Sequence, residues 1–128
     1  MKQEPCKVLV VDEDRDNADT TVMLLQMWGH EAEAAYSAED ATSKAGALDP
    51  DVVLLDLGRQ IVTGLSLADE LKRHCPHAKL VAITGFTAGD IVRRARNAGF
   101  EKVLLKPATA TRLKEAVDTE CAAVQAKA

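Results

Sequence analysis

Four apolar runs in this chain each end on a polar side chain that could take part in metal or phosphoryl chemistry. KVLVV precedes Asp12 and Glu13, DVVLL precedes Asp56, KLVAI precedes Thr84, and KVLL precedes Lys106. Carboxylate oxygens are the ligands that Mg²⁺ prefers, whereas an ammonium group and a hydroxyl can donate hydrogen bonds to phosphoryl oxygens. These residue types together predict a site that binds a divalent cation and handles a phosphoryl group.

The runs that carry these residues are typical of strands buried on both faces of a parallel sheet. In an open parallel sheet, ligands bind outside the carboxyl ends of the strands. The polar residues at the ends of the runs are therefore expected to converge on one edge of the sheet. Strands are predicted at residues 7–11, 31–35, 52–56, 79–84 and 102–105.

Helical patterns fill the segments between the predicted strands. Residues 15–28 carry apolar side chains at helical spacing, and Asp14 is the expected N-cap of this helix. The sequence SAED from Ser37 to Asp40 resembles a capping box that opens a helix ending before Asp49. Further helices are predicted at residues 64–74, 88–98 and 109–124. The alternation predicts a (βα)₅ order, in which a doubly wound parallel sheet has helices on both faces.

The composition fits one α/β domain spanning residues 1–128. Hydrophobic residues make up 47% of the chain and aromatic residues 3%, so the core is expected to be aliphatic. The formal net charge of −4, without a basic run, argues against nucleic acid as a partner. No segment has the apolar length needed to cross a membrane, and no signal peptide is evident at the N-terminus.

The cysteines and histidines outside the strand ends suggest no further site. Cys6, Cys75 and Cys121 are odd in number and far apart, which predicts reduced thiols in a cytoplasmic protein rather than a disulfide framework. The segment HCPH at residues 74–77 could offer zinc ligands, but its proline and the lack of a distant ligand pair favour a solvated loop. His30 is expected at the surface.

Several motifs resemble the receiver domain of two-component response regulators. They are VLVVDED, VVLLD, the Thr63-Gly64 pair, VAITG and LLKP, and the resemblance runs from about Lys7 to the C-terminal helix. It implies a flavodoxin-like fold with strand order 2-1-3-4-5. The stretch AITGF…NAGFEKVLLKP is most similar to receivers attached to hybrid sensor kinases.

The resemblance assigns a role to each polar residue at the strand ends. Asp56 takes the phosphoacceptor position, where its carboxylate would attack phosphorus and form an acyl phosphate. Mg²⁺ would bind Glu13 directly, Asp12 through water, Asp56, and the backbone carbonyl of Gly58. Without the cation the carboxylates should repel one another, so the pKa of at least one of them should rise.

The resemblance also implies how the phosphoryl group is held and where it comes from. Thr84 would hydrogen-bond one phosphoryl oxygen, Lys106 would pair with another, and Pro107 would follow a cis peptide bond. The donor would be the phosphohistidine of a sensor histidine kinase or a histidine phosphotransfer protein. Such a domain assists only its own phosphorylation and dephosphorylation, so the chain is not expected to be an enzyme.

Two regions depart from the receiver pattern. Arg59 and Gln60 stand where an apolar residue and a proline are usual, so the loop after Asp56 should differ in stiffness. Val103 replaces the aromatic residue whose rotation normally carries the phosphorylation signal. The readout of phosphorylation is therefore expected to differ.

Two alternatives remain open at the level of sequence. VLVVDED also resembles the nucleophile motif of haloacid-dehalogenase-type phosphohydrolases, with Asp12 as nucleophile, although Asp16 stands where Thr or Val is expected. A pseudo-receiver that keeps the fold as an interaction module is the other alternative. The changes at Val103 and in the loop keep it open, although all five site positions are filled, which counts against it. A flavodoxin is disfavoured because the DEDRDN loop would repel a phosphate.

Overall fold

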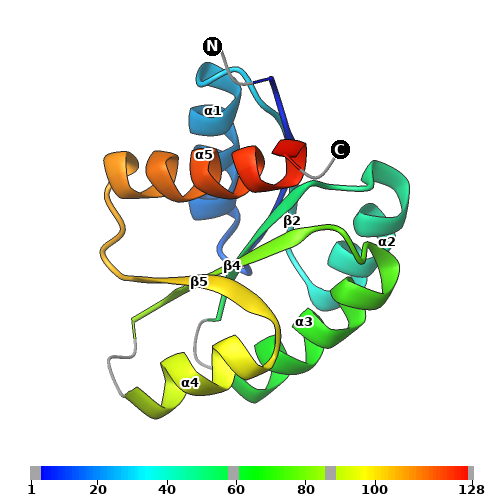
Figure 1. The fold of residues 1–128 in the computed structure, drawn as a ribbon, viewed down its shortest axis with the longest axis vertical. Helices are drawn as coiled ribbons and strands as arrows, with labels where there is room; N and C mark the ends of the chain where they lie inside the picture. The colour runs from blue at the N-terminus through cyan, green and yellow to red at the C-terminus, as the bar shows by residue number, and fades with distance from the viewer. Residues whose placement is uncertain (1–3, 58–60, 86–88, 127–128) are drawn as a thin grey trace.

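The computed structural model describes residues 4–57, 61–85 and 89–126, which form a five-stranded parallel sheet with helices on both faces (Figure 1). The strand order is β2-β1-β3-β4-β5, which confirms the predicted flavodoxin-like (βα)₅ topology. The strands are β1 (Lys7–Val11), β2 (Glu31–Ala35), β3 (Val52–Asp56), β4 (Lys79–Thr84) and β5 (Phe100–Leu105).

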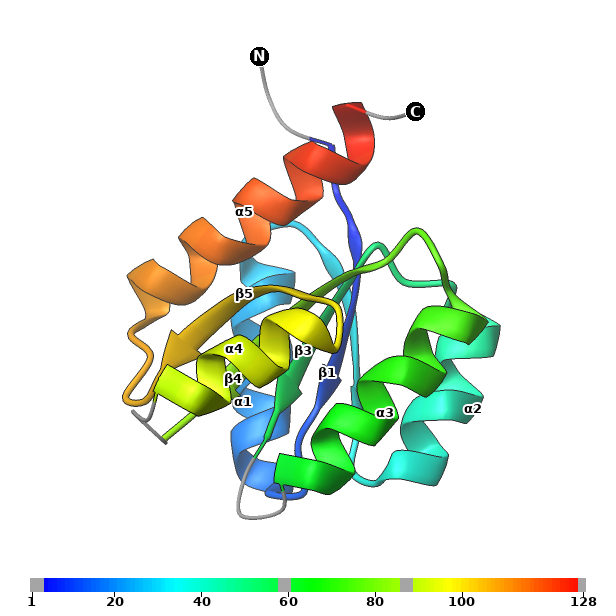
Figure 2. The same cartoon turned by 60° about the horizontal axis from the view of Figure 1, so that its bottom comes forward.

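Five helices connect and flank these strands. They are α1 (Arg15–Met27), α2 (Ala38–Leu48), α3 (Ile61–His74), α4 (Gly89–Asn97) and α5 (Ala110–Ala126). Helices α1 and α5 cover one face of the sheet, and α2, α3 and α4 cover the other (Figures 1 and 2). Within the described residues, no helix is both long and apolar enough to cross a membrane.

Local sequence signals fix where the helices begin and end. The Asp14 side chain accepts a hydrogen bond from the Asn17 N–H and caps α1, and the Ser37 side chain accepts one from the Asp40 N–H and caps α2. Gly29 and Gly99 follow α1 and α4 with φ of +94° and +106°, a conformation that glycine adopts without steric cost. These caps confirm the predicted starts of both helices.

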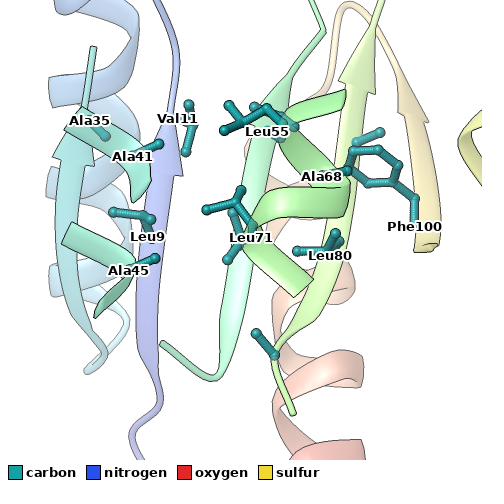
Figure 3. Close-up of a cluster of buried hydrophobic side chains, with 14 of the residues drawn as sticks. Leu9, Val11, Ala35, Ala41, Ala45, Leu55, Ala68, Leu71, Leu80 and Phe100 are labelled. Carbon is teal, nitrogen blue, oxygen red and sulfur yellow. The ribbon is translucent and has the colours of Figure 1, made fainter. Parts of the chain in front are cut away.

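Strands and helices pack into two aliphatic cores, one on each face of the sheet. Alternate residues of β1 enter opposite cores: Leu9 packs with α2 and α3, whereas Val8 packs with α1 and α5. Figure 3 shows the first core, where Ala41 and Ala68 let the helices approach the sheet closely and Phe100 lies at one end. This packing fixes the strands in register and therefore fixes the positions of the residues that follow them.

The prediction of three reduced thiols is wrong: Cys6 and Cys121 form a disulfide, and Cys75 alone is free. The two residues are 115 positions apart in the sequence, but their Cα atoms lie 6.0 Å apart. Cys6 directly precedes β1, and Cys121 lies on α5, which packs back against the same face of the sheet. Sequence spacing does not reveal this proximity because it arises only when α5 folds over β1.

The prediction for His30 is wrong, whereas that for the histidines of the HCPH segment is confirmed. His30 is buried rather than exposed, and its Nδ1 accepts a hydrogen bond of 3.0 Å from the Cys6 N–H. In the HCPH segment His74, Pro76 and His77 are exposed as expected, but Cys75 is buried and donates its S–H to the Leu71 carbonyl. In the described parts of the chain, no three His, Cys, Asp or Glu side chains form a cluster suited to a metal.

Candidate functional site

Strand register brings the predicted site residues to the carboxyl edge of the sheet. Val11 of β1 pairs with Leu55 of β3, so the residues that follow them, Asp12 and Asp56, are neighbours. On the other side of β3, Asp56 pairs with Ile83, the residue before Thr84. The central strands therefore present Asp12, Asp56 and Thr84 along one short stretch of this edge.

Lys106 completes this edge from the end of β5. Its N–H donates a 2.8 Å hydrogen bond to the Thr84 carbonyl, which holds the backbone after β5 against β4. Its Nζ lies 2.7 Å from Oδ2 of Asp56. The peptide bond between Lys106 and Pro107 is cis, as the motif predicted.

The Asp56–Lys106 pair is asymmetric in exposure. The Asp56 side chain is only 7% exposed, whereas that of Lys106 is 42% exposed. A hydrogen bond between two ionised groups is shorter and stronger than one between neutral groups. Lys106 therefore supplies positive charge beside a largely buried carboxylate. Its exposed side chain can still move toward a negatively charged group that becomes attached to Asp56.

Asp12 is held by two hydrogen bonds from the start of α1. Its Oδ1 accepts from the Asp14 N–H at 2.9 Å, and its Oδ2 accepts from the Asn17 side-chain amide at 2.5 Å. Burial raises the pKa of Asp12, and the charge of Asp56 raises it further, against the lowering effect of these hydrogen bonds and of Lys106. The predicted rise in a carboxyl pKa is confirmed, although burial rather than mutual repulsion is its largest cause.

Glu13 and Thr84 differ sharply in their surroundings. Glu13 is exposed and lines the pocket beside Asp56, where its longer side chain can reach a cation from the solvent side. Thr84 is fully buried. No buried side-chain nitrogen or oxygen of the described residues lacks a hydrogen-bond partner, so Thr84 would exchange partners rather than gain a first one if it turned toward a phosphoryl group.

A pocket of about 630 Å³ opens beside Asp12, Glu13, Asp56 and Lys106. Its lining combines acidic and basic side chains with residues of α2 and α3. The lining residues are Val11, Asp12, Glu13, Asp14, Tyr36, Ser37, Ala38, Leu55, Asp56, Leu57, Gly64, Leu67 and Lys106. The volume leaves space for a hydrated cation and a phosphoryl group above Asp56.

Sequence reasoning missed two residues of this region, Asn17 and Tyr36. The Tyr36 hydroxyl donates a 2.5 Å hydrogen bond to Asp19, and the Arg15 guanidinium lies 4.3 Å from the centre of its ring. The hydrogen bond to Asp19 is the main reason that the pKa of Tyr36 is raised. The position of Asn17, one helical turn after the acidic residues, could have identified its contact with Asp12, but nothing local identifies Tyr36.

The donor set at this edge fits Mg²⁺. Asp12, Glu13 and Asp56 offer carboxylate oxygens. A cation bound beside Asp12 would favour its ionised form and so oppose the burial that raises the pKa of this carboxyl. Mg²⁺ keeps several waters and needs few protein ligands, which agrees with the lack of a tight three-residue metal cluster in the described ranges. Gly58, the predicted carbonyl ligand, lies outside the described residues, as do Arg59 and Gln60.

Val103 stands partly buried on β5 and packs against the core between the sheet and α2, α3 and α4. Phe86 and Phe100 are aromatic residues that could take over the role of the ring missing at position 103. Phe100 is buried in that core with 3% exposure. It pairs with Leu80 at one end of the β4–β5 ladder, whereas Thr84 pairs with Leu105 at the other end, so Phe100 lies away from Thr84. Phe86 lies outside the described residues.

Known proteins similar to this chain are response regulators. A response regulator receiver protein of Anaeromyxobacter sp. (strain Fw109-5) is 32% identical over 107 residues, covering 84% of this chain and 45% of that protein. VraR of Staphylococcus epidermidis (strain RP62A) is 35% identical over 81 residues, covering 63% of this chain and 39% of that protein. The chain thus spans less than half the length of these curated relatives.

Solved structures agree with this similarity. A CheY-like receiver domain from Methanospirillum hungatei JF-1 has a TM-score of 0.88 with 22% identity, covering 98% of this chain and 100% of that one, and so supports the fold. A response regulator from Burkholderia pseudomallei, solved with a phosphorylated aspartic acid, calcium ion and citrate, has a TM-score of 0.80 with 28% identity. It covers 94% of this chain and 71% of that one.

The same conclusion follows from the match to a protein family as a whole. Residues 8–118 match the response regulator receiver domain. The match runs from β1 into α5 and includes every residue of the candidate site. Together with the observed strand order and the polar edge of the sheet, it establishes that this chain belongs to the response regulator receiver domain family.

Proposed function

We propose that Asp56 is the phosphoacceptor of this receiver domain and takes its phosphoryl group from a phosphohistidine. The observation that carries the proposal is the contact of 2.7 Å between Lys106 Nζ and Oδ2 of the largely buried Asp56. Receiver domains are signalling phosphoacceptors and generally depend on Mg²⁺. In this chain Asp56 is the carboxylate that lies beside both the acidic residue Asp12 and a lysine.

The transfer is a substitution at phosphorus. An oxygen of the Asp56 carboxylate forms a bond to phosphorus while the bond from phosphorus to the donor's imidazole nitrogen breaks, and that nitrogen keeps the electron pair. The product is an aspartyl phosphate. Lys106 stabilises the negative charge on one phosphoryl oxygen, and Thr84 donates a hydrogen bond to another. Attack of water on the phosphorus later releases phosphate and restores the carboxylate.

A bound Mg²⁺ would neutralise charge between the carboxylates and the incoming phosphoryl group. Asp12 and Glu13, with Asp56 and the Gly58 carbonyl, are the residues proposed to hold it. Asp14 and Asn17 orient the Asp12 carboxylate by their hydrogen bonds, as groups behind a metal ligand commonly do. A Glu at position 13 reaches farther than the aspartate usual in the family, which suits its exposed position.

The wider setting follows from the same proposal. A sensor histidine kinase or a histidine phosphotransfer protein would be the donor, in the cytoplasm, and residues 1–128 would act as one domain that turns over no separate substrate. Attachment to a hybrid kinase stays a prediction. The Burkholderia relative with its phosphorylated aspartic acid supports the expected product.

Acetyl phosphate tests this proposal without a cognate kinase. Wild type with Mg²⁺ should gain one phosphoryl group in intact-protein mass spectrometry, and removal of Mg²⁺ by a chelator should prevent the gain. Glu33→Gln, which changes an exposed carboxylate on β2, serves as a matched control and should behave as wild type. Absence of phosphorylation of folded wild type by any small donor would favour a pseudo-receiver, and hydrolysis of added phosphate esters would favour a phosphohydrolase.

A further inference from the structure

The Cys6–Cys121 disulfide joins two parts of the fold that lie near opposite ends of the sequence. Cys6 directly precedes β1, and Cys121 lies in the C-terminal half of α5. The start of β1 and the end of α5 lie side by side in both views of the molecule (Figures 1 and 2). The bond therefore fastens the end of α5 to the central part of the sheet.

Cys6 is held in place by contacts that do not involve its sulfur. Its N–H donates to His30 Nδ1 at 3.0 Å, and its carbonyl accepts from the Glu31 N–H at 3.0 Å. Both partners lie at the start of β2, the strand beside β1. The position of Cys6 is thus set by the sheet and would persist in the reduced protein.

Cys121 is likewise positioned by the packing of its helix. Ala116 and Val117 on the same helix are fully buried in the core shared with α1, and Asp118 Oδ1 lies 3.5 Å from Nε2 of the buried His30. Two thiols held this way stay close together after reduction. Prior orientation of reacting groups gives a large rate advantage over free thiols, so the bond can re-form without refolding.

The fold does not need this bond as a staple. A chain of 128 residues buries roughly two-thirds of its unfolded surface, and disulfides are concentrated in small secreted domains that lack such a core. If the domain works in a reducing cytoplasm, a step that rests on the function proposed above, a disulfide there is usually transient or redox-sensing.

Gln125 covers the bond from the last turn of α5. Its side-chain Nε2 donates to the Glu4 carbonyl at 2.7 Å and lies 3.8 Å from the Cys6 sulfur and 3.5 Å from the Cys121 sulfur. Both cysteines are buried, whereas Gln125 is only partly buried, one residue before α5 ends. Fraying of a terminal turn needs little free energy, and here it would lift the Gln125 side chain away from the sulfurs.

We propose that Cys6 and Cys121 form a reversible redox modification site, covered by Gln125, that fastens the C-terminal half of α5 to the start of β1. The reductant is a small thiol such as glutathione. Its thiolate attacks one sulfur, the S–S bond breaks, and the other cysteine leaves as a thiolate that takes up a proton. A second glutathione thiolate then displaces the protein sulfur from the mixed disulfide and yields oxidised glutathione. The reverse exchange with oxidised glutathione removes two electrons and two protons from the cysteine pair.

This site is distinct from the phosphoacceptor edge. Cys6 precedes β1 and Asp12 follows it, and at a rise of about 3.3 Å per residue the two ends are roughly 20 Å apart. Reduction should therefore loosen the end of α5 while leaving the rate of Asp56 phosphorylation unchanged. The domain would then receive a redox input on α5 that is separate from its phosphorylation input.

Thiol counting in glutathione buffers tests the modification. Native protein is equilibrated in reduced or oxidised glutathione and then denatured in the presence of an alkylating agent. Its intact mass, measured by mass spectrometry, gives the number of alkylated cysteines. We expect three alkylated cysteines after reduction and one, Cys75, after oxidation, with the fold retained in both states. A pair that resists excess reduced glutathione until the protein unfolds would make the bond a permanent staple, and a pair that stays reduced in oxidised glutathione would remove the site; either result overturns the proposal.

Variants test the position of the bond and its cover. Amide hydrogen exchange in the last turns of α5 should speed up on reduction of wild type and of Cys75→Ser, whereas Cys6→Ser should exchange rapidly in both buffers. Gln125→Ala should be reduced by glutathione several-fold faster than wild type, and Glu115→Ala, an exposed change on the same helix, should not. Equal reduction rates for Gln125→Ala and wild type would refute the role of Gln125. Equal amide exchange rates in α5 of the reduced and the oxidised protein would refute the claim that the disulfide fastens this helix. Unchanged phosphorylation by acetyl phosphate in both buffers would separate these outcomes from failure of the phosphoacceptor proposal.

Discussion

Nζ of Lys106, which is 42% exposed, lies 2.7 Å from Oδ2 of Asp56, which is only 7% exposed. Asp56 ends β3, and Lys106 follows β5. These two strands are not neighbours, since β4 lies between them. The contact of the two residues therefore depends on the register of three strands and on the hydrogen bond from Lys106 to the Thr84 carbonyl. The packing of the sheet thus leads directly to the chemistry proposed at its edge.

Removal of the Lys106 charge should slow phosphorylation more than it affects the fold. Lys106→Ala leaves the negative charge of the phosphoryl oxygens without its ammonium partner, and loss of a positioned donor at such a site typically costs tenfold or more, or at least about 1.4 kcal/mol. The rate of phosphorylation by acetyl phosphate, followed by mass spectrometry, measures this. Lys102→Ala on the same strand is the control and should keep the wild-type rate. An unchanged rate in Lys106→Ala would remove Lys106 from the site.

The pH dependence of stability should report on Asp12. Burial, helped by the charge of Asp56, raises its pKa above the usual 3.8, so the folded state binds this proton more tightly than the unfolded state does. As pH rises through the folded pKa, the ionised carboxylate destabilises the metal-free domain. Asp12→Asn should therefore be more stable than wild type at neutral pH, and the difference should shrink as pH falls toward 3.8.

Urea unfolding in the presence of a chelator, at a series of pH values, checks this dependence. Asp12→Asn keeps a carbonyl oxygen that can accept from the Asp14 N–H, so the loop should hold its shape. Glu33→Gln at an exposed position on β2 should show no such trend. A neutral-pH loss of stability in Asp12→Asn would mean that its hydrogen bonds outweigh the cost of burying its charge.

Mg²⁺ should stabilise wild type but not Glu13→Ala. A ligand that binds only the folded state raises the free energy of unfolding by about 2.7 kcal/mol at a concentration one hundred times its Kd. Glu13 is exposed, so its truncation should leave the apo fold intact. Thermal unfolding is a better readout than tryptophan fluorescence. The tryptophan of the chain, Trp28, lies at the far end of α1, roughly 20 Å from the pocket, and would report binding there poorly. Equal stabilisation of both proteins by Mg²⁺ would exclude Glu13 as a ligand.

Phosphorylation should rearrange this domain less than it does a receiver with an aromatic switch residue. Thr84 can turn toward a phosphoryl oxygen, but Val103 is short, restricted in χ1 and packed against the core. It cannot follow Thr84 as a rotating ring would, and a ligand shifts an equilibrium only by its differential affinity for two states. Amide chemical shifts with and without beryllofluoride should change around Asp56 and Thr84 and little along α5. Large shifts throughout β5 and α5 would show that another route connects the site to that face.

Much of the site could be predicted because it depends on local signals. Apolar runs of four or five residues predicted the strands, and in a parallel sheet the residues after such runs share one edge. Asp12, Asp56, Thr84 and Lys106 therefore met where they were expected. The caps at Asp14 and Ser37 were equally local and were confirmed.

The errors involve contacts between segments that are distant in sequence. The buried His30 contacts Asp118 of α5, and its Nδ1 accepts from the N–H of Cys6, the residue before β1. The Cys6–Cys121 bond likewise closes across 115 residues. No periodicity or capping motif encodes how α5 lies on the sheet, so these contacts became visible only in the folded chain.

The central claim is that Asp56 carries the phosphoryl group. Wild type treated with acetyl phosphate and Mg²⁺ is trapped with borohydride, which reduces an acyl phosphate, and then cleaved and sequenced by mass spectrometry; Asp56→Asn and Asp12→Asn are treated in parallel. We predict reduction at Asp56 alone in wild type and no modification of Asp56→Asn. Modification at Asp12, or an equally phosphorylated Asp56→Asn, would contradict the account.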